Sequence, residues 1–168
     1  MAEQELKKLG FTEDASEGAP ICRWQHGQIK LDLMSLDEKI LGFSNRWYKS
    51  AMDTANEFEI ERDIRIRVVT APYFCATKLE GSKVEAKGDY LASHDLEDLI
   101  TVVDGRPELL DELRAAPEDV RSYIADAVGQ MLKARQFIDA LAGYLLPDSA
   151  SQARINQLLA KLTQISEL

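Results

Sequence analysis

Asp32 is the residue whose type and position most clearly suggest chemistry. It stands in the run IKLDLM (29–34), where aspartate has a poor preference for a strand. A carboxylate fixed on a strand can bind Mg²⁺ or act as a general base, because the backbone holds its direction. An exposed aspartate near a sheet edge fits the same pattern, so the residues alone leave both interpretations open.

The other residues with chemical potential form no complete site in the sequence. His94 and Asp98 are one helical turn apart, which suits two metal ligands, but helix capping with surface charge is the favoured interpretation. Cys22 and Cys75 offer neither a disulfide scaffold nor a paired metal spacing, and we expect buried free thiols in a reducing compartment. The chain has no nucleophile elbow, phosphate loop or dinucleotide glycine fingerprint.

The composition predicts a globular protein and argues against a dedicated binder of duplex nucleic acid. The 168 residues are 45% hydrophobic, which predicts one globular domain or one domain with a helical extension. A net charge of −9 argues against a dedicated binder of duplex nucleic acid, which needs a basic face to release counterions. Bases exceed acids in residues 21–50, the segment whose sign suits a phosphate, whereas the acidic block 93–116 is expected to be solvated. No signal peptide or membrane-spanning run is recognisable, so we expect a cytoplasmic protein.

The first seventy residues predict a helix and then strands. A helix over 2–9 ends at Gly10, and a loop follows over 11–19. The strands predicted from their alternation, the first pair joined by a tight turn at His26-Gly27, are 21–25, 29–34, 57–61 and 64–69. The second pair alternates apolar and charged residues, so one face should lie in water, and residues 41–48 should form a loop with a short helix.

Helices dominate after Thr70. We expect them to begin near Pro72, at Ser93, near Pro107 and at Pro117, and a last one to be capped by Ser149 or Ser151. The helix from Pro117 should run to Pro147, with one apolar stripe formed by Val120, Ile124, Val128, Met131, Ile138, Leu141 and Leu145.

These elements predict an α+β protein with a small mixed or antiparallel sheet of about four strands, followed by a helical half. The expected ranges are a truncated α/β core over 1–70, helices packed on the sheet over 71–147, and a C-terminal helix over 148–168. All three should form one compact unit.

Several segments resemble a bacterial nucleotidyltransferase family of the minimal polymerase-β-like superfamily, similar to the AbiEii-type toxin nucleotidyltransferases. The resemblance spans roughly residues 9–145. It is carried by the strings LGF (9–11), EGAPICRW (17–24), IKLDLM (29–34), LGFSNRWY (41–48), APYFCATKLE (71–80) and DYLASHDLED (89–98).

The resemblance implies a nucleotidyltransferase-like fold and transfer of a nucleoside monophosphate from a nucleoside triphosphate to an acceptor, with Mg²⁺ held by three carboxylates. Asp32 matches the third metal carboxylate and would be catalytic. Lys78 matches the family's lysine, which binds the nucleotide's phosphates. Asp95 and Asp98 match an acidic helix start and would be structural or would orient that lysine. Arg46 is a further nucleotide contact suggested by its basic segment, and packing of Trp47 explains that segment equally well.

The chain departs from the family pattern at the metal site. It contains no Asp-x-Asp pair, and Gly81-Ser82 follows an expected helix rather than a strand. A missing first strand would leave an exposed sheet edge or an uncovered apolar face. The chain is then either a truncated form of an active enzyme or a degenerate homologue. In the second case it would be a non-catalytic binding or assembly module, acting through a homodimer or an antitoxin-type partner.

Overall fold

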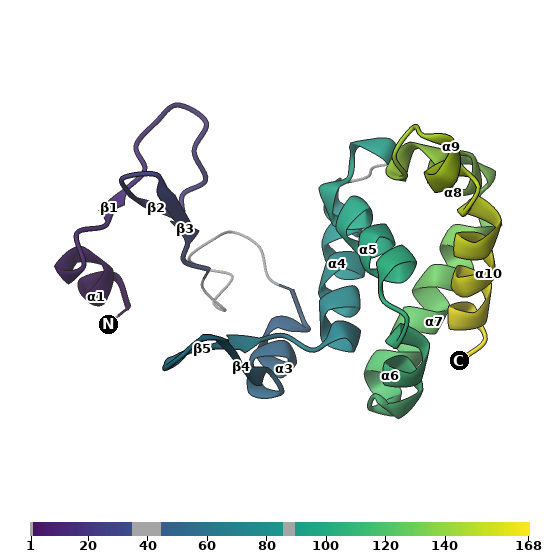
Figure 1. The fold of residues 1–168 in the computed structure, drawn as a ribbon, viewed down its shortest axis with the longest axis horizontal. Coiled ribbons are helices and arrows are strands. Elements are labelled where there is room, and N and C mark those ends of the chain that lie inside the picture. Colours follow the sequence, from purple (N-terminus) through teal and green to yellow (C-terminus); the bar gives the residue numbers. More distant parts are fainter. Residues whose placement is uncertain (1, 35–44, 86–89) are drawn as a thin grey trace. The chain divides into compact units, whose positions relative to one another are not determined.

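The computed structural model describes residues 2–34, 45–85 and 90–168, apart from the side chains at 84 and 85. The chain divides into two compact units, an N-terminal unit (Met1–Ser44) and a helical unit (Asn45–Leu168), which are described one at a time (Figure 1). Helices and small antiparallel sheets together confirm the α+β class. No helix among the described residues is long and apolar enough to cross a membrane.

The N-terminal unit is a short helix followed by a three-stranded antiparallel sheet. Its elements are α1 (Ala2–Lys8), β1 (Thr12–Glu13), β2 (Arg23–His26) and β3 (Ile29–Asp32). The strand order is β1-β2-β3, and a tight turn at Gly27-Gln28, in which Gly27 has φ of 59°, joins β2 to β3. The turn lies one residue after the predicted His26-Gly27, because His26 still pairs with Ile29. The expectation of a loop over 11–19 was wrong at β1, because a strand of two residues is too short to leave an alternating pattern.

The helical unit begins with helix α3 (Tyr48–Asp53) and the antiparallel hairpin of β4 (Asn56–Glu61) and β5 (Ile64–Val68). Residues 41–44 of the predicted 41–48 segment lie outside the described residues. Both faces of the hairpin are exposed, although one face was expected to be covered. Its apolar side chains, between 42% and 59% exposed, are Phe58, Ile60, Ile64, Ile66 and Val68.

The strands form two sheets, which corrects the expectation of one sheet of about four strands. Each predicted pair closes through its own tight turn, so each strand bonds to its neighbour in sequence. Among the described residues, no strand joins the β1-β2-β3 sheet to the β4-β5 hairpin. The predicted boundaries after residues 70 and 147 stay a prediction.

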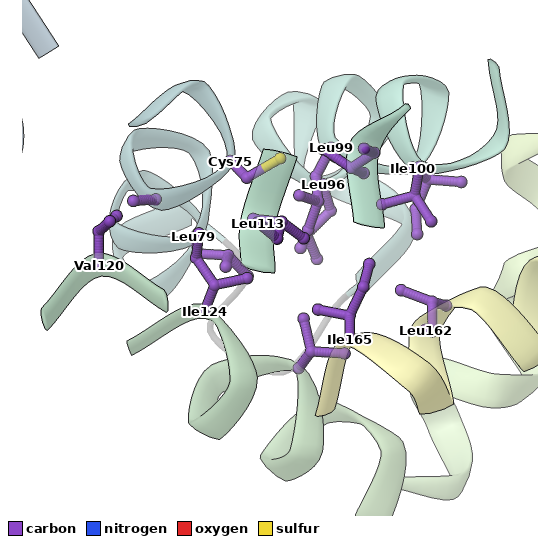
Figure 2. Packing of buried hydrophobic residues seen from close by; sticks show 14 of the residues in the cluster. Cys75, Leu79, Leu96, Leu99, Ile100, Leu113, Val120, Ile124, Leu162 and Ile165 are labelled. Atoms are coloured by element: carbon purple, nitrogen blue, oxygen red, sulfur yellow. The ribbon is translucent and has the colours of Figure 1, made fainter. Parts of the chain in front are cut away.

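Helices make up the rest of the helical unit and pack around one apolar core. They are α4 (Ala71–Glu85), η1 (Tyr90–Ala92), α5 (His94–Gly105), α6 (Leu109–Ala115), α7 (Glu118–Lys133), α8 (Arg135–Ala140), η2 (Leu141–Tyr144), α9 (Ser149–Gln152) and α10 (Ile155–Ser166). Figure 2 shows side chains from α4, α5, α6, α7 and α10 converging, and burying them supplies the main favourable term for folding. The labelled ones are Cys75, Leu79, Leu96, Leu99, Ile100, Leu113, Val120, Ile124, Leu162 and Ile165.

The long helix predicted from Pro117 to Pro147 is interrupted. It ends at Lys133, and Ala134 is extended, with φ of −87° and ψ of 112°, before α8 begins. The break turns Phe137 into the core at 0% exposure and leaves Ile138, a predicted stripe residue, 38% exposed. Burial of the larger aromatic side chain compensates for the backbone hydrogen bonds lost at the break.

Helix caps are confirmed at one predicted position and corrected at another. Ser93 Oγ accepts a hydrogen bond from the Leu96 backbone N–H at 3.3 Å, as expected for the cap of α5. The cap predicted at Ser149 or Ser151 is Asp148, whose carboxylate accepts from the Ser151 N–H at 2.9 Å. Asp148 therefore caps the short helix α9, and α10 begins separately at Ile155.

Candidate functional site

Lys78 lies at the centre of an ion cluster between α4 and the first turns of α5. Its Nζ is 2.9 Å from Asp95 Oδ1 and 2.6 Å from Asp98 Oδ2. Asp95 and Asp98 are three residues apart, so both face the same side of α5. The side chains of Lys78 and Asp95 are 25% and 21% exposed, which shields this pair from bulk water. The structure therefore brings together three of the residues singled out in the sequence.

The cluster keeps Lys78 protonated. Burial alone would lower the pKa of the ammonium, but hydrogen bonds to Asp98 and Asp95 outweigh it and raise that pKa above its ordinary value. A protonated lysine is neither a nucleophile nor a general base at neutral pH. Its ammonium has three N–H donors, and the two carboxylates leave one of them for a further acceptor, such as a phosphate oxygen.

Two neighbouring side chains support this arrangement. Asn45, which is 9% exposed, donates from its amide to the Thr77 carbonyl at 2.8 Å and accepts from the Trp47 N–H at 3.1 Å. It thereby holds the start of α3 against α4. Burial, followed by the negative charge of Asp95, raises the pKa of Tyr48, which remains a neutral phenol.

Arg46 belongs to a second cluster, built on aromatic rings. Its guanidinium carbon lies 4.8 Å from the Trp47 ring centroid and 4.3 Å from that of Tyr123, and its Nε is 3.7 Å from Glu80. Glu80 also accepts from the Tyr123 hydroxyl at 2.6 Å and from Lys83 at 3.1 Å. Arg46 thus packs over Trp47, as one of the two sequence interpretations expected, while its side chain stays 57% exposed.

The second cluster contains more positive than negative charge, because Arg46 and Lys83 both contact the single carboxylate of Glu80. Burial would raise the pKa of Glu80, but the hydrogen bonds from Tyr123 and Lys83 outweigh it and lower that pKa. The pKa of Tyr123 rises, first through burial and then through its bond to Glu80. One carboxylate therefore faces two cations, Arg46 and Lys83. A groove of about 340 Å³ between α4 and α7 continues from Tyr123 and Lys83.

Asp32 is held in the N-terminal unit by a cross-strand ion pair. Arg23 Nε lies 2.8 Å from its Oδ1, and Arg23 Nη2 lies 2.9 Å from its Oδ2. The hydrogen bonds from Arg23 lower the pKa of Asp32, whose side chain is 39% exposed. Both carboxylate oxygens are thus engaged by one guanidinium, as in a bidentate structural pair.

The described residues do not fit a resident magnesium site. No group of three histidine, cysteine, aspartate or glutamate side chains within them is placed to hold a metal ion. Arg23 engages both oxygens of Asp32. His94 approaches Glu97 at 3.7 Å, while Asp98 binds Lys78, so the His94 and Asp98 spacing is not used as a ligand pair.

The sequence analysis did not predict two side-chain contacts, that of Arg23 with Asp32 and that of Tyr123 with Glu80. The pairing of Arg23 with Asp32 follows from the turn at Gly27-Gln28, which sets His26 opposite Ile29 and Arg23 opposite Asp32. The predicted turn at His26-Gly27 would instead have set Arg23 opposite Lys30. No local signal could have found the contact of Tyr123 with Glu80, since these residues are 43 positions apart and on different helices.

Comparisons of the chain with protein-family models, with curated proteins and with solved structures gave no match.

Proposed function

We propose that this chain is a nucleotidyltransferase-family protein with a nucleotidyltransferase-like fold. It binds a nucleoside triphosphate, and an oxygen of the acceptor bonds to the α-phosphorus as the α–β anhydride bond breaks and pyrophosphate leaves, so that the nucleoside monophosphate is transferred. The observation that carries the proposal is the state of Lys78, a charged ammonium fixed by Asp95 and Asp98, with a third N–H donor that hydrogen-bonds to no other residue in the described part of the chain. Lys78 and both carboxylates also lie in the strings that resemble the family.

In this proposal the chain's own residues bind and orient the triphosphate. Lys78 donates to a phosphate oxygen, while Asp95 and Asp98 keep its amine protonated and directed. Arg46 adds a second cation, since its guanidinium stays more than half exposed above Trp47 and Tyr123. Mg²⁺ would enter as the counterion of the triphosphate, because the described residues do not build a metal site of their own.

Nucleotide binding and label transfer test the proposal. Calorimetry with each magnesium nucleoside triphosphate should give a measurable Kd, and α-labelled triphosphate should label total RNA or protein. Lys78→Ala should weaken binding by about tenfold or more, the loss expected for one hydrogen bond to a charged group. Lys133→Ala, at an exposed lysine ending α7, is the matched control and should leave Kd unchanged. Absence of binding and transfer, with no effect of Lys78→Ala, would refute the proposal.

A non-catalytic binding or assembly module is the second candidate. It is favoured by the ion pair that occupies Asp32 and by the exposed apolar side chains of the β4-β5 hairpin. Such a module would act through a second copy or an antitoxin-type partner. Light scattering, which measures the mass of the chain in solution, helps to distinguish the two candidates. A chain that is monomeric and transfers label would contradict the non-catalytic module.

A further inference from the structure

Gly81 stands where the Asp95 carboxylate meets helix α4. A Cβ added at position 81 would lie 2.0 Å from Asp95 Oδ2 and 3.0 Å from its Cγ. The other oxygen of the same carboxylate, Oδ1, is 2.9 Å from Lys78 Nζ. Asp95 therefore reaches Lys78 across a site on α4 that is free only because residue 81 has no side chain.

The backbone does not explain this glycine. Gly81 lies inside α4 and is not among the glycines with positive φ, so any residue could adopt its conformation. Glycine also weakens a helix interior relative to alanine. Gly129 in α7 offers a comparison, since a Cβ there would meet only Ser166 Cβ at 3.6 Å, an ordinary contact. What distinguishes Gly81 is the carboxylate lying against it.

We propose that Gly81 is a positioning residue: its missing side chain seats the Asp95 carboxylate against α4, and that carboxylate fixes the Lys78 ammonium in the direction of its ligand. Residues 78 and 81 are three apart and share one face of α4, opposite the first turn of α5. The coupling of Gly81 to Lys78 needs no nucleotide. Its role in phosphate binding rests on the proposed function.

An alanine at position 81 should act locally. The conflict is with the end of a short side chain, so Asp95 can rotate away while the helix backbone stays in place. Asp98 Oδ2, 2.6 Å from Lys78 Nζ, still contacts the ammonium, but Lys78 loses Asp95, one of its two carboxylate partners. The better helix preference of alanine offsets part of that loss, so the variant should stay folded with an altered Lys78.

The acylation rate of Lys78, followed by mass spectrometry on the full chain, tests the coupling. Gly81→Ala should raise that rate about fivefold, because an ammonium with fewer carboxylate partners loses its proton more readily. Asp95→Ala should raise it similarly, and the double variant should show no further increase. Gly129→Ala should leave it unchanged. An unchanged rate in Gly81→Ala, or fully additive effects in the double variant, would overturn the proposal.

Folding and nucleotide titration of the variants extend the test. If Gly81→Ala fails to fold, the double variant with Asp95→Ala should fold, since the conflicting atoms are gone; failure of both would overturn the proposal. In nucleotide titrations, Gly81→Ala should weaken Kd about fivefold relative to Gly129→Ala. An unchanged Kd would overturn the positioning role in binding but leave the proposed function standing. A faster acylation of Lys78 without any nucleotide binding by the unmodified chain would support the positioning and refute the proposed function.

Discussion

Replacing Phe137 by alanine tests the break after α7. Phe137 is 0% exposed and packs edge-on against Tyr90, with ring centroids 5.5 Å apart. Truncating a fully buried phenylalanine costs about 3–5 kcal/mol of unfolding free energy, which includes the cavity left behind. For the helical unit (Asn45–Leu168), this loss should lower Tm by about 12–19 °C. Urea denaturation followed by circular dichroism gives the free energy directly.

Ile138→Ala is the matched control at the next position. Ile138 is 38% exposed, so its truncation should cost only about 1 kcal/mol. An uninterrupted helix reverses this order: at 100° per residue, Ile138 lies within about 40° of Ile124, and Phe137 lies about 140° away. A larger loss for Ile138→Ala than for Phe137→Ala would refute the break and the packing derived from it.

Three further changes test separate contacts. Ser93→Ala removes the cap of α5 and should cost about 1 kcal/mol in urea denaturation, and an unchanged midpoint would contradict the cap. Glu112 has a lowered pKa because Arg106 donates hydrogen bonds to it, so its stabilisation is present above the unfolded value near 4.5 and is lost as pH falls through the folded pKa. Glu112→Gln should therefore flatten the loss of stability below about pH 4.5, and an unaltered acid profile would count against this pair. Asp32→Ala breaks an exposed ion pair with Arg23, so the midpoint of urea denaturation should stay nearly unchanged; a large fall would show that the N-terminal unit depends on the pair.

Local signals in the sequence were enough to predict some elements of this fold but not all of them. The tight turn that contains Gly27, the cap at Ser93 and the end of α5 at Gly105 each depend on residues within a few positions, so the sequence alone could predict them, the turn to within one residue. The break at Ala134 could not be predicted, because the apolar stripe continues past it. Burial of Phe137 among distant helices, rather than local preference, decides that point.

In the candidate site, too, the features set by local spacing could be predicted, whereas those set by helix packing could not. Asp95 and Asp98 were expected either to be structural or to orient Lys78, and helical spacing alone places them on one face of α5. Their meeting with Lys78 depends on the packing of α4 against α5, and the closeness of Asp95 to Gly81 depends on it too. A sequence pattern cannot predict such a contact, because the residues lie on different helices.

Each of the two units contains one tryptophan and one cysteine, which can report on the unfolding of that unit. Trp24 and Cys22 belong to the N-terminal unit, whereas Trp47 and Cys75 belong to the helical unit. Cys75 is 1% exposed, and burial raises the pKa of its thiol to about 12, so it should react with thiol reagents only when the helical core opens. Cys22 is half-buried and should react without such opening. Thiol labelling with Trp24→Phe and Trp47→Phe fluorescence can therefore time the unfolding of each unit separately, using reporters that the chain already carries.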